Sequence, residues 1–254
     1  MNQLIRYADP IRVDDPAECQ FYHLMNIPGA GEVGGAWDLR HCISEYLGDF
    51  DFLGKRVLDV GTASGFLTFE MERMGAEVVS FDMDDGAQWD LVPQKDVREN
   101  TEKCQRDARE AHRRLKNAYW FCHSRLGSKA RAFYGNIYQM PTELGPFDVA
   151  VMAMIISHLR DPFQAMYHAS RLCKRHFIVT NPLFTDKRPM AALIPTRENN
   201  LSSAWWAFSE VCIEQIFGVL GFKVIRKVTS QPRCMVAGQE RVEPCVAVVG
   251  ERID

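Results

Sequence analysis

The sequence predicts an α/β fold: a doubly wound, mostly parallel sheet of seven strands, with helices on both faces and an antiparallel last strand. Two observations support this prediction. Residues 56–82 read as an apolar strand, a glycine turn, a helix and a second strand, which is the unit that joins parallel strands. Residues 147–153 read as a strand that contains a continuous apolar run, as strands buried on both faces of a parallel sheet do.

The expected elements follow in order along the chain. The first unit has a strand at residues 56–60, a turn at 61–65, a helix at 66–74 and a strand at 77–81. The other expected strands are residues 130–134, 147–153, 176–180, 222–228 and 245–250, the last two forming a hairpin. The other expected helices are residues 41–47, 161–173 and 204–220, with a charged helical insertion at about 85–128. Asp161 and Pro162 suit the first turn of their helix, and Gly221 suits the end of the last one.

Two regions are predicted. Residues 1–54 form an N-terminal extension that contributes to the substrate pocket, and residues 55–254 form the cofactor-binding domain. The N-terminus has early charges and prolines in place of a signal peptide, and the longest apolar run, residues 149–156, is far shorter than the ~20 residues of a membrane span. The eight cysteines include no C-x-x-C pair, so we expect reduced thiols. A cytoplasmic protein without membrane contact is the prediction.

The overall charge does not favour nucleic acid as a partner. The net charge is −3 and the pI is about 6.2, so no global attraction to a polyanion exists. The expected partner is a small-molecule substrate, although tRNA is not excluded. Composition says nothing about the oligomeric state.

Four residues around the first two strands suit one ligand. Gly61 and Gly65 let the backbone turn tightly and approach a ligand, and the turn leads into a helix N-terminus that favours a carboxylate or phosphate. Asp82, at the end of the second strand, can accept two hydrogen bonds from the vicinal hydroxyls of a ribose. Asp59 can accept from an ammonium group or orient the loop amides. A ligand with carboxylate, ammonium and ribose at these points is S-adenosylmethionine (SAM).

A nicotinamide or flavin dinucleotide is the rival ligand. Its fingerprint is G-x-G-x-x-G with an acid about 20 residues later. Counted from Gly61, Ala63 and Phe66 replace the second and third glycines, and an acid inside the strand, such as Asp59, is not part of the pattern. The turn therefore favours SAM, with a purely structural turn as the other alternative.

Four motifs and the final strand pair resemble those of the class I, seven-stranded SAM-dependent methyltransferases over about residues 40–250. The motifs are LDVGTASG (58–65), VVSFD (78–82), GNIYQMP (135–141) and FDVAVMAMIISHL (147–159). The resemblance implies that the first turn holds the methionine part of SAM, that Asp82 holds the ribose, and that residues 154–158 line the methyl-transfer site. The residues implied to bind the cofactor are Asp59, Gly61, Thr62, Ala63, Ser64, Gly65, Asp82, Met83, Asn136, Ile137 and Met154.

Two positions depart from the family pattern, and a closer similarity adds an RNA alternative. Ala63 stands where the middle glycine is usual, and Asn136 stands where an acid often contacts the adenine. The segments FYHLMNIPG, WDLR, GKRVLDVG and SHLRDP are most similar to the branch that contains the tRNA wobble-uridine carboxymethyl transferase. In such an enzyme the charged residues 96–117 would face RNA; a solvated helix with i,i+4 charge pairs is the alternative.

His158 is the candidate catalytic base. Methyl transfer needs a base when the acceptor is a hydroxyl or a protonated amine, and His158 follows the fourth strand on the ligand side. A structural histidine that caps the helix start at Asp161 is the alternative. No metal is expected, because Met154 and Thr180 stand where metal-dependent relatives carry acids and no His/Cys cluster has zinc spacing.

The acceptor pocket is expected to combine the N-terminal extension, the insertion and residues 183–208. Its candidate substrate residues are Tyr22, His23, Trp37, Arg40, Trp205 and Trp206. The two tryptophans, expected within the helix at 204–220, would form a stacking wall for a flat or sugar-like acceptor, or else pack against the sheet. Arg40 would pair with a carboxylate of SAM or of the substrate.

The sequence therefore predicts a SAM-dependent methyltransferase that acts by in-line displacement on oxygen or nitrogen of a small-molecule acceptor, without a metal. A tRNA wobble-uridine modifying transferase and a SAM-binding regulator without turnover are the alternatives. The motifs do not name the acceptor, because one fold serves many acceptors.

Overall fold

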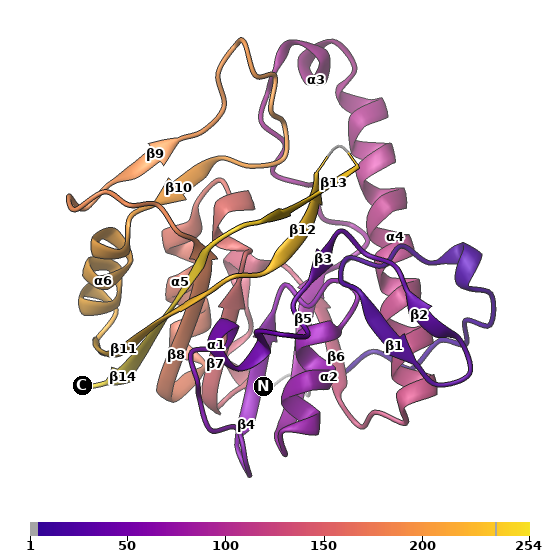
Figure 1. Ribbon diagram of the computed structural model, residues 1–254, viewed down its shortest axis with the longest axis horizontal. Helices are drawn as coiled ribbons and strands as arrows, with labels where there is room; N and C mark the ends of the chain where they lie inside the picture. Colours follow the sequence, from indigo (N-terminus) through magenta and orange to yellow (C-terminus); the bar gives the residue numbers. More distant parts are fainter. Residues whose placement is uncertain (1–4, 237) are drawn as a thin grey trace.

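The computed structural model describes residues 5–236 and 238–254, and its centre is a seven-stranded sheet (Figure 1). In spatial order the strands are β11 (Phe222–Ser230), β14 (Cys245–Arg252), β8 (Cys173–Pro182), β7 (Phe147–Ala153), β4 (Arg56–Val60), β5 (Glu77–Met83) and β6 (Arg131–Gly135). Strands β4 to β8 run parallel, whereas β14 is antiparallel to both of its neighbours, β8 and β11. The predicted fold class is confirmed, including the antiparallel last strand.

Helices cover both faces of this sheet. One face carries α1 (Ile43–Tyr46), α2 (Phe66–Arg73) and α4 (Thr101–Leu126), and the other carries α5 (Pro162–Arg171) and α6 (Glu210–Val219). Successive strand residues point to opposite faces, so Val57 packs in the first core and Leu58 in the second. No helix within the described ranges is both long and apolar enough to cross a membrane.

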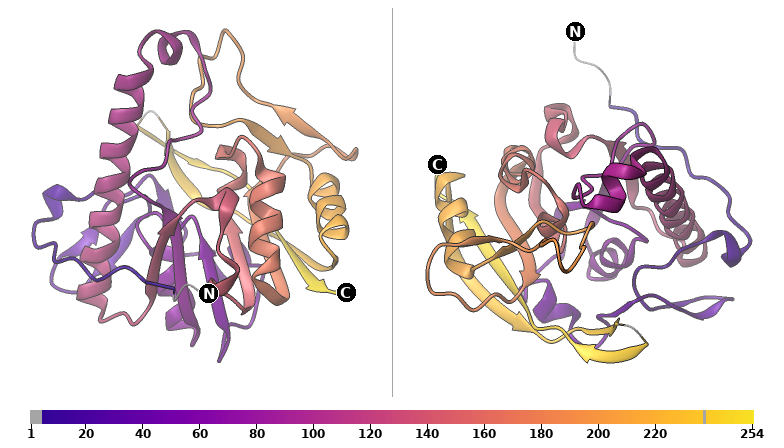
Figure 2. Two further views of the ribbon diagram at one scale, coloured as in Figure 1. Left: turned by 180° about the vertical axis from the view of Figure 1, so that it is seen from behind. Right: turned by 90° about the horizontal axis from the view of Figure 1, so that it is seen from above.

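The chain reverses direction across the sheet at β4, which lies between β5 and β7. Ligands of open parallel sheets bind beyond the carboxyl ends of the strands at such a switch point. Those ends face the part of the molecule that contains α3 (Lys95–Glu99) and the hairpin of β9 (Ala191–Leu193) and β10 (Trp206–Phe208) (Figures 1 and 2). A ligand site is therefore expected in the crevice beyond the carboxyl end of β4.

Most of the charged insertion, expected to be helical over about residues 85–128, is one long helix. The charged residues 101–117 and the apolar residues 118–126 form the single helix α4, and only the short α3 precedes it. The apolar end packs in the core through Tyr119 and Phe121. The other end projects beyond the sheet toward α3 (Figure 2).

The helix expected at residues 204–220 is wrong in its first part. Residues Trp206–Phe208 form β10, which pairs with β9, and α6 begins only at Glu210. Ser209 explains the boundary, because its Oγ accepts a hydrogen bond from Cys212 N at 3.2 Å and caps the helix. The helix expected at 41–47 is likewise shortened to α1, and that expected at 161–173 ends at Arg171.

The last two strands of the large sheet pair as expected, but they do not form a simple hairpin. Between them, β12 (Arg233–Val236) and β13 (Gln239–Val242) form an excursion, and β12 pairs with β3 (Trp37–Asp38) of the N-terminal extension. The extension also contains η1 (Pro16–Glu18) and the hairpin of β1 (Met25–Ile27) and β2 (Gly31–Val33). The remaining short helices are η2 (Ile137–Gln139), η3 (Thr142–Leu144) and η4 (Ile156–His158).

Candidate active site

The glycine turn after β4 has a backbone that few residues tolerate. Gly61 and Gly65 adopt φ of +81° and +89°, in the left-handed region. A Cβ on Gly65 would lie 2.5 Å from the Phe69 ring and 2.8 Å from that of Tyr119. Ala63 also has a positive φ, +49°, which an L-residue adopts only at an energetic cost. The turn is thus strained and tightly packed, as functional turns often are.

Asp82, at the end of β5, holds this turn in place. Its carboxylate accepts hydrogen bonds from Ala63 N and Met83 N, each at 2.7 Å, and from His112 Nε2 at 3.1 Å. Burial opposes ionisation, but His112 and the two amides outweigh it and keep the pKa of Asp82 below its usual value. Asp82 is therefore an ionised acceptor at the mouth of the crevice.

Asp59 lies deeper, beneath the turn. Its carboxylate accepts from Thr68 Oγ1 at 2.6 Å, and Thr68 Oγ1 also lies 2.8 Å from Thr62 Oγ1. Burial raises the pKa of Asp59 to about 6, although the threonine hydroxyls counteract part of this effect. The amide of Ala63 is bound by Asp82 instead, so Asp59 supports α2 and the turn from below. Its contact with an ammonium group stays a prediction.

The sheet brings the other predicted cofactor residues to the same edge. Met83 ends β5, and Asn136 and Ile137 follow β6, its neighbour. Asn136 Oδ1 accepts from Tyr138 N at 2.8 Å and so caps the short helix η2. Met154 follows β7 with a left-handed φ of +58°, a second strained residue at this edge. Their contacts with adenine stay predictions.

His158, at the end of η4, is fixed by one backbone contact. Its Nδ1 lies 2.6 Å from Ser203 O, and since a carbonyl can only accept, Nδ1 carries the proton. The helix start at α5 is capped by Asp161, whose Oδ1 accepts from Gln164 N at 3.0 Å. The alternative of a capping histidine is therefore wrong, and the catalytic role stays a prediction.

The two tryptophans lie on extended backbone beside His158, not on a helix. Trp205 donates from Nε1 to Asp90 O at 2.6 Å, and Trp206 donates from Nε1 to Arg160 O at 3.3 Å. Both side chains stay partly exposed. Their indole N–H groups thus join loops, and the Arg160 guanidinium lies over the Trp205 ring, 5.8 Å from its centroid. Their role as a stacking wall stays a prediction.

The N-terminal extension lies against the glycine turn. Tyr22 N donates to Ser64 Oγ at 3.1 Å, and Trp37 N donates to Tyr22 O at 3.3 Å. His23 is buried, with its ring centroid 5.3 Å from that of Phe66 at the start of α2, and its Nδ1 has no partner in the structure. Burial lowers the pKa of His23 to about 3, so the ring is neutral.

Arg40 is already paired. Its guanidinium lies 2.9 Å from carboxylate oxygens of both Asp38 and Glu32. These two acids give the arginine charge a local partner on the extension. A pairing with a cofactor or substrate carboxylate stays a prediction, which would require that this cluster open.

The sequence matches the family described as "Methyltransferase domain" over residues 38–227. The chain belongs to this methyltransferase family. Its cofactor is SAM, and the resemblance found in the motifs after β4, β5, β6 and β7 is confirmed. No curated protein matches the sequence.

Solved structures of methyltransferases share the fold. Magnesium protoporphyrin IX methyltransferase of Synechocystis PCC 6803, with bound SAH, is 14% identical with a TM-score of 0.51, over 85% of this chain and 82% of its own. A putative RNA methyltransferase of Pyrococcus horikoshii is 15% identical with a TM-score of 0.51, over 84% and 85%. 1,6-Didemethyltoxoflavin N1-methyltransferase of Burkholderia thailandensis, with bound 1,6-didemethyltoxoflavin and S-adenosylhomocysteine, is 14% identical with a TM-score of 0.51, over 85% and 78%. At these identities the likeness shows the fold alone.

The methyltransferase site has donors and acceptors that fit SAM. The first N–H groups of α2 face the turn and suit a carboxylate, and Asp82 is an ionised acceptor one strand away. The buried Nδ1 of His23 has no hydrogen-bond partner among the described residues, and its ring lies beside the same helix start. A buried polar atom without a partner indicates a missing ligand or water. The residues present therefore fit an amino-acid end at α2 and a ribose at β5.

Two residues of this methyltransferase site were missed in the sequence. His112 reaches Asp82 from α4, 30 positions away. Asp90, in the loop after β5, accepts from the Tyr138 hydroxyl and from Arg160 N, the latter at 2.9 Å. Neither residue belongs to a motif, because both act on segments that are distant in the sequence. A charged helix face and a loop acid carry no local signal of such contacts.

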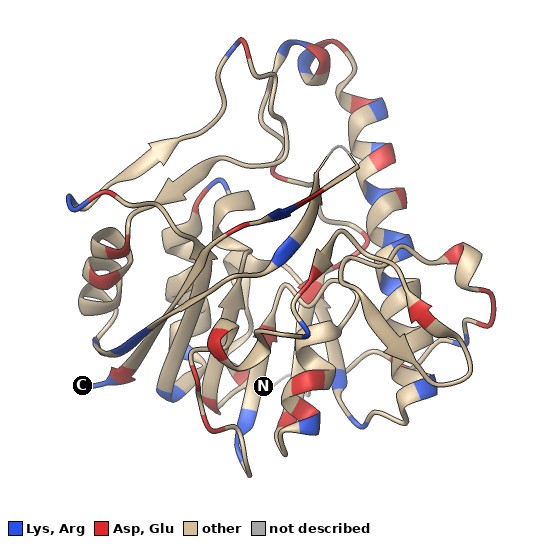
Figure 3. Cartoon of the chain, in the orientation of Figure 1, with Lys and Arg blue, Asp and Glu red and all other residues tan. Residues whose placement is uncertain are grey.

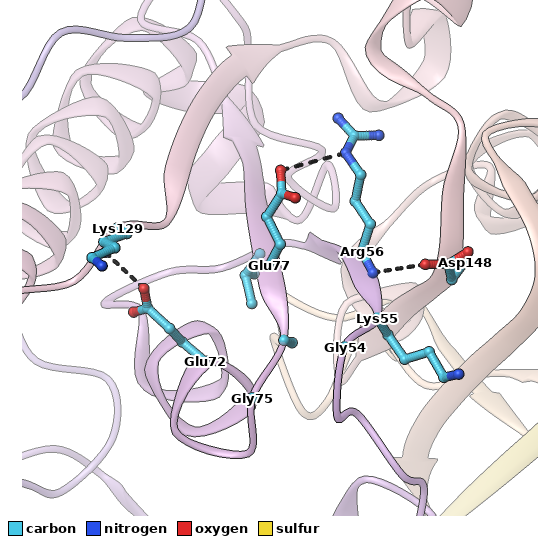
Figure 4. A pocket seen from close by; sticks show the side chains of 10 residues that line it. Gly54, Lys55, Arg56, Glu72, Gly75, Glu77, Lys129 and Asp148 are labelled. Atoms are coloured by element: carbon cyan, nitrogen blue, oxygen red, sulfur yellow. Dashed lines mark hydrogen bonds and ion pairs between the residues drawn. The ribbon is translucent and has the colours of Figure 1, made fainter.

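A hollow of about 530 Å³ opens at the opposite, amino ends of β4 and β5 (Figure 4). Two of its acids are bound by Arg56: the backbone Arg56 N donates to Asp148 Oδ2 at 2.8 Å, and Arg56 Nε lies 3.7 Å from Glu77 Oε1. In the described residues no cluster of three His, Cys, Asp or Glu side chains could hold a metal ion. The hollow lies at the end of β4 opposite the glycine turn, so it does not include the predicted cofactor residues.

Proposed function

We propose that this methyltransferase moves the methyl group of SAM to an oxygen or nitrogen atom of a small-molecule acceptor, without a metal. The observation that carries the proposal is the state of His158. Its Nδ1–H bonds Ser203 O at 2.6 Å, so in the neutral imidazole the lone pair is on Nε2, beyond the carboxyl end of β7. A fixed imidazole with a free Nε2 suits the removal of a proton from an acceptor O–H or N–H.

The cofactor half of the site is proposed to hold SAM by its two ends. The turn from Gly61 to Gly65 and the α2 N-terminus take the amino-acid end, and Asp82 takes the ribose. Met83, Asn136 and Ile137 lie where the adenine would follow. SAM supplies a methyl group that is already electrophilic. The chain itself orients SAM and the acceptor, excludes water and, at His158 Nε2, accepts the proton of the acceptor O–H or N–H.

Orientation is the largest effect that this site can supply. Holding two reactants in a near-attack geometry lowers a barrier by roughly 7–11 kcal/mol. The segments that would do so are tied together around Asp90, which contacts Arg160 through its carboxylate and Trp205 through its carbonyl. These contacts join the loops after β5, β7 and β9 over the strand ends. A closed, oriented site requires such connections.

Four aromatic side chains near the site favour a flat, small molecule as the acceptor. Trp205 and Trp206 flank His158, and Tyr22 and Trp37 of the N-terminal extension lie across the glycine turn. We propose that the extension thereby forms part of the pocket. The named substrates of two fold relatives, magnesium protoporphyrin IX and 1,6-didemethyltoxoflavin, are also flat. Met154 follows β7, and Thr180 lies opposite Ala153 within β8; neither side chain offers a carboxylate for a metal.

The charges along α4 make RNA a less suitable acceptor than a small molecule. Basic and acidic side chains alternate along α4 (Figure 3), and several form pairs within the helix. Lys103 lies 2.6 Å from Asp107, and Arg113 lies 2.7 Å from Glu110. The helix keeps a net positive charge, with seven basic and three acidic residues, but these pairs interrupt the uniform positive stripe that phosphate binding requires.

The test is incubation of the enzyme with methyl-labelled SAM and separated pools of small molecules and RNA, followed by mass spectrometry of the labelled product. We expect label in a small aromatic compound. Label in RNA would support the tRNA alternative, and SAM binding without any labelled product would support the regulator. The eight free thiols fit a reducing compartment, and we place the reaction in the cytoplasm as part of the proposal.

A further inference from the structure

Asp82 is unusually well supplied with donors from the chain itself. Oδ1 accepts from Met83 N at 2.7 Å and from His112 Nε2 at 3.1 Å, and Oδ2 accepts from Ala63 N at 2.7 Å. An ionised carboxylate offers about four lone-pair positions. The chain therefore fills three of them, and the open position is on Oδ2.

His112 is a built contact and not a passing surface side chain. Its side chain is 6% exposed, against 15% for that of Asp82. The ring lies edge-on to Trp89, with the centroids 6.1 Å apart. Gln105, seven residues before His112 on α4, binds the backbone of Trp89. Trp89 N donates to Gln105 Oε1 at 3.2 Å, and Gln105 Nε2 donates to Trp89 O at 3.1 Å.

We propose that His112 is a specificity-determining residue that limits Asp82 to a single hydroxyl of the cofactor ribose. The inference rests on the proposed function, because it requires the ribose at Asp82. A vicinal diol can place one O–H on each carboxylate oxygen only if each oxygen keeps a lone pair free. His112 occupies the position on Oδ1 that the second hydroxyl needs. Asp82 then recognises one hydroxyl, and the other adds little to affinity.

The native enzyme alone can test this inference. Calorimetry would give the affinity for S-adenosylhomocysteine and for its 2′-deoxy and 3′-deoxy analogues. A hydrogen bond to a charged group corresponds to about tenfold or more in affinity. We expect one analogue to bind about tenfold or more weakly and the other to change by less than about threefold. Equal losses for both analogues would overturn the inference and keep the ribose at Asp82, whereas no loss for either would overturn that placement as well.

Variants of α4 sharpen the test. His112→Phe keeps a ring against Trp89 but has no donor, so Oδ1 becomes free and both deoxy analogues should then bind several-fold more weakly than S-adenosylhomocysteine. His112→Gln keeps an N–H donor and should keep the single-hydroxyl pattern. His123→Phe is the matched control, because His123 is on the same helix and bonds Ala130 O at 2.9 Å, away from Asp82. The native pattern in His112→Phe would refute the inference.

Discussion

The cofactor half and the acceptor half of this methyltransferase site are built in different ways. The amino-acid and ribose part of the cofactor half comes from one continuous stretch, β4 to β5, in which the turn and Asp82 are joined directly by the Ala63 amide. The acceptor half joins distant segments: Asp90 contacts Arg160 and Trp205. A local motif is therefore sufficient for the first half, whereas the second exists only after the chain has folded.

The kind of hydrogen bond also differs between the halves. In the cofactor half, particular side chains such as Asp82 and Thr68 are required. In the acceptor half, Trp205 and His158 donate to the backbone carbonyls of Asp90 and Ser203. Any residue supplies a carbonyl, so such contacts leave no pattern in the sequence. The comparison predicts that variants of the two halves fail in different ways.

The largest expected effect is in the acceptor half. His158→Ala should lower kcat by about a hundredfold or more, since a positioned base contributes roughly that much. The affinity for SAM should not change, because His158 lies outside the cofactor half. Steady-state kinetics and calorimetry measure the two quantities. His168→Ala on α5 is the control, and an equal loss of kcat and SAM affinity in His158→Ala would show a purely structural role.

The next largest effect is on folding stability and comes from Asp59, which lies beneath the glycine turn of the cofactor half. Burial raises the pKa of Asp59 from 3.8 to about 6, so the folded protein binds this proton more tightly than the unfolded chain does. The protonated Asp59 therefore stabilises the folded protein, by about 3 kcal/mol. This contribution to the free energy of unfolding is complete below about pH 4 and is lost as the pH rises through about 6. Asp59→Asn should remove this loss in urea unfolding between pH 4 and 7. The exposed Asp85→Asn should retain it; a native pH dependence in Asp59→Asn would contradict the prediction.

Asp82 tests the cofactor half directly. Asp82→Ala should weaken SAM binding by more than tenfold, because a hydrogen bond to a charged group contributes about 1.5–3 kcal/mol. Calorimetry with S-adenosylhomocysteine gives the value. Asp85→Ala removes a nearby acid that pairs with Lys116 on the surface, and its affinity should remain native. Unchanged affinity in Asp82→Ala would break the assignment of the cofactor half.

The smallest effect comes from the turn. Ala63 has φ +49°, a conformation that costs an L-residue roughly 1–2 kcal/mol. Glycine would remove this strain, but its greater conformational entropy in the unfolded chain would offset part of the gain in stability. Ala63→Gly should therefore raise the free energy of unfolding by less than about 1 kcal/mol. Ala111→Gly, inside α4, should lower it by about 1 kcal/mol. A loss of stability in Ala63→Gly would mean that the turn is not strained at this position.

The sequence predicted the large sheet well and the loops above it poorly. The strand at Phe147–Ala153 is correct to the residue, because a continuous apolar run has few other structures open to it. Trp206 was expected on a helix, but β9 pairs with its segment and Ser209 delays the helix. The pairing of β12 with β3, nearly 200 positions apart, has no local signal.

By itself, the sequence determined the fold and the family and predicted where SAM binds, because apolar periodicity and two glycines act over a few neighbouring residues. Tertiary structure alone decided that His112 reaches Asp82, that Asp90 joins three loops, and that His158 presents Nε2. Those outcomes depend on which distant segments are packed together, and packing is set by the whole core at once.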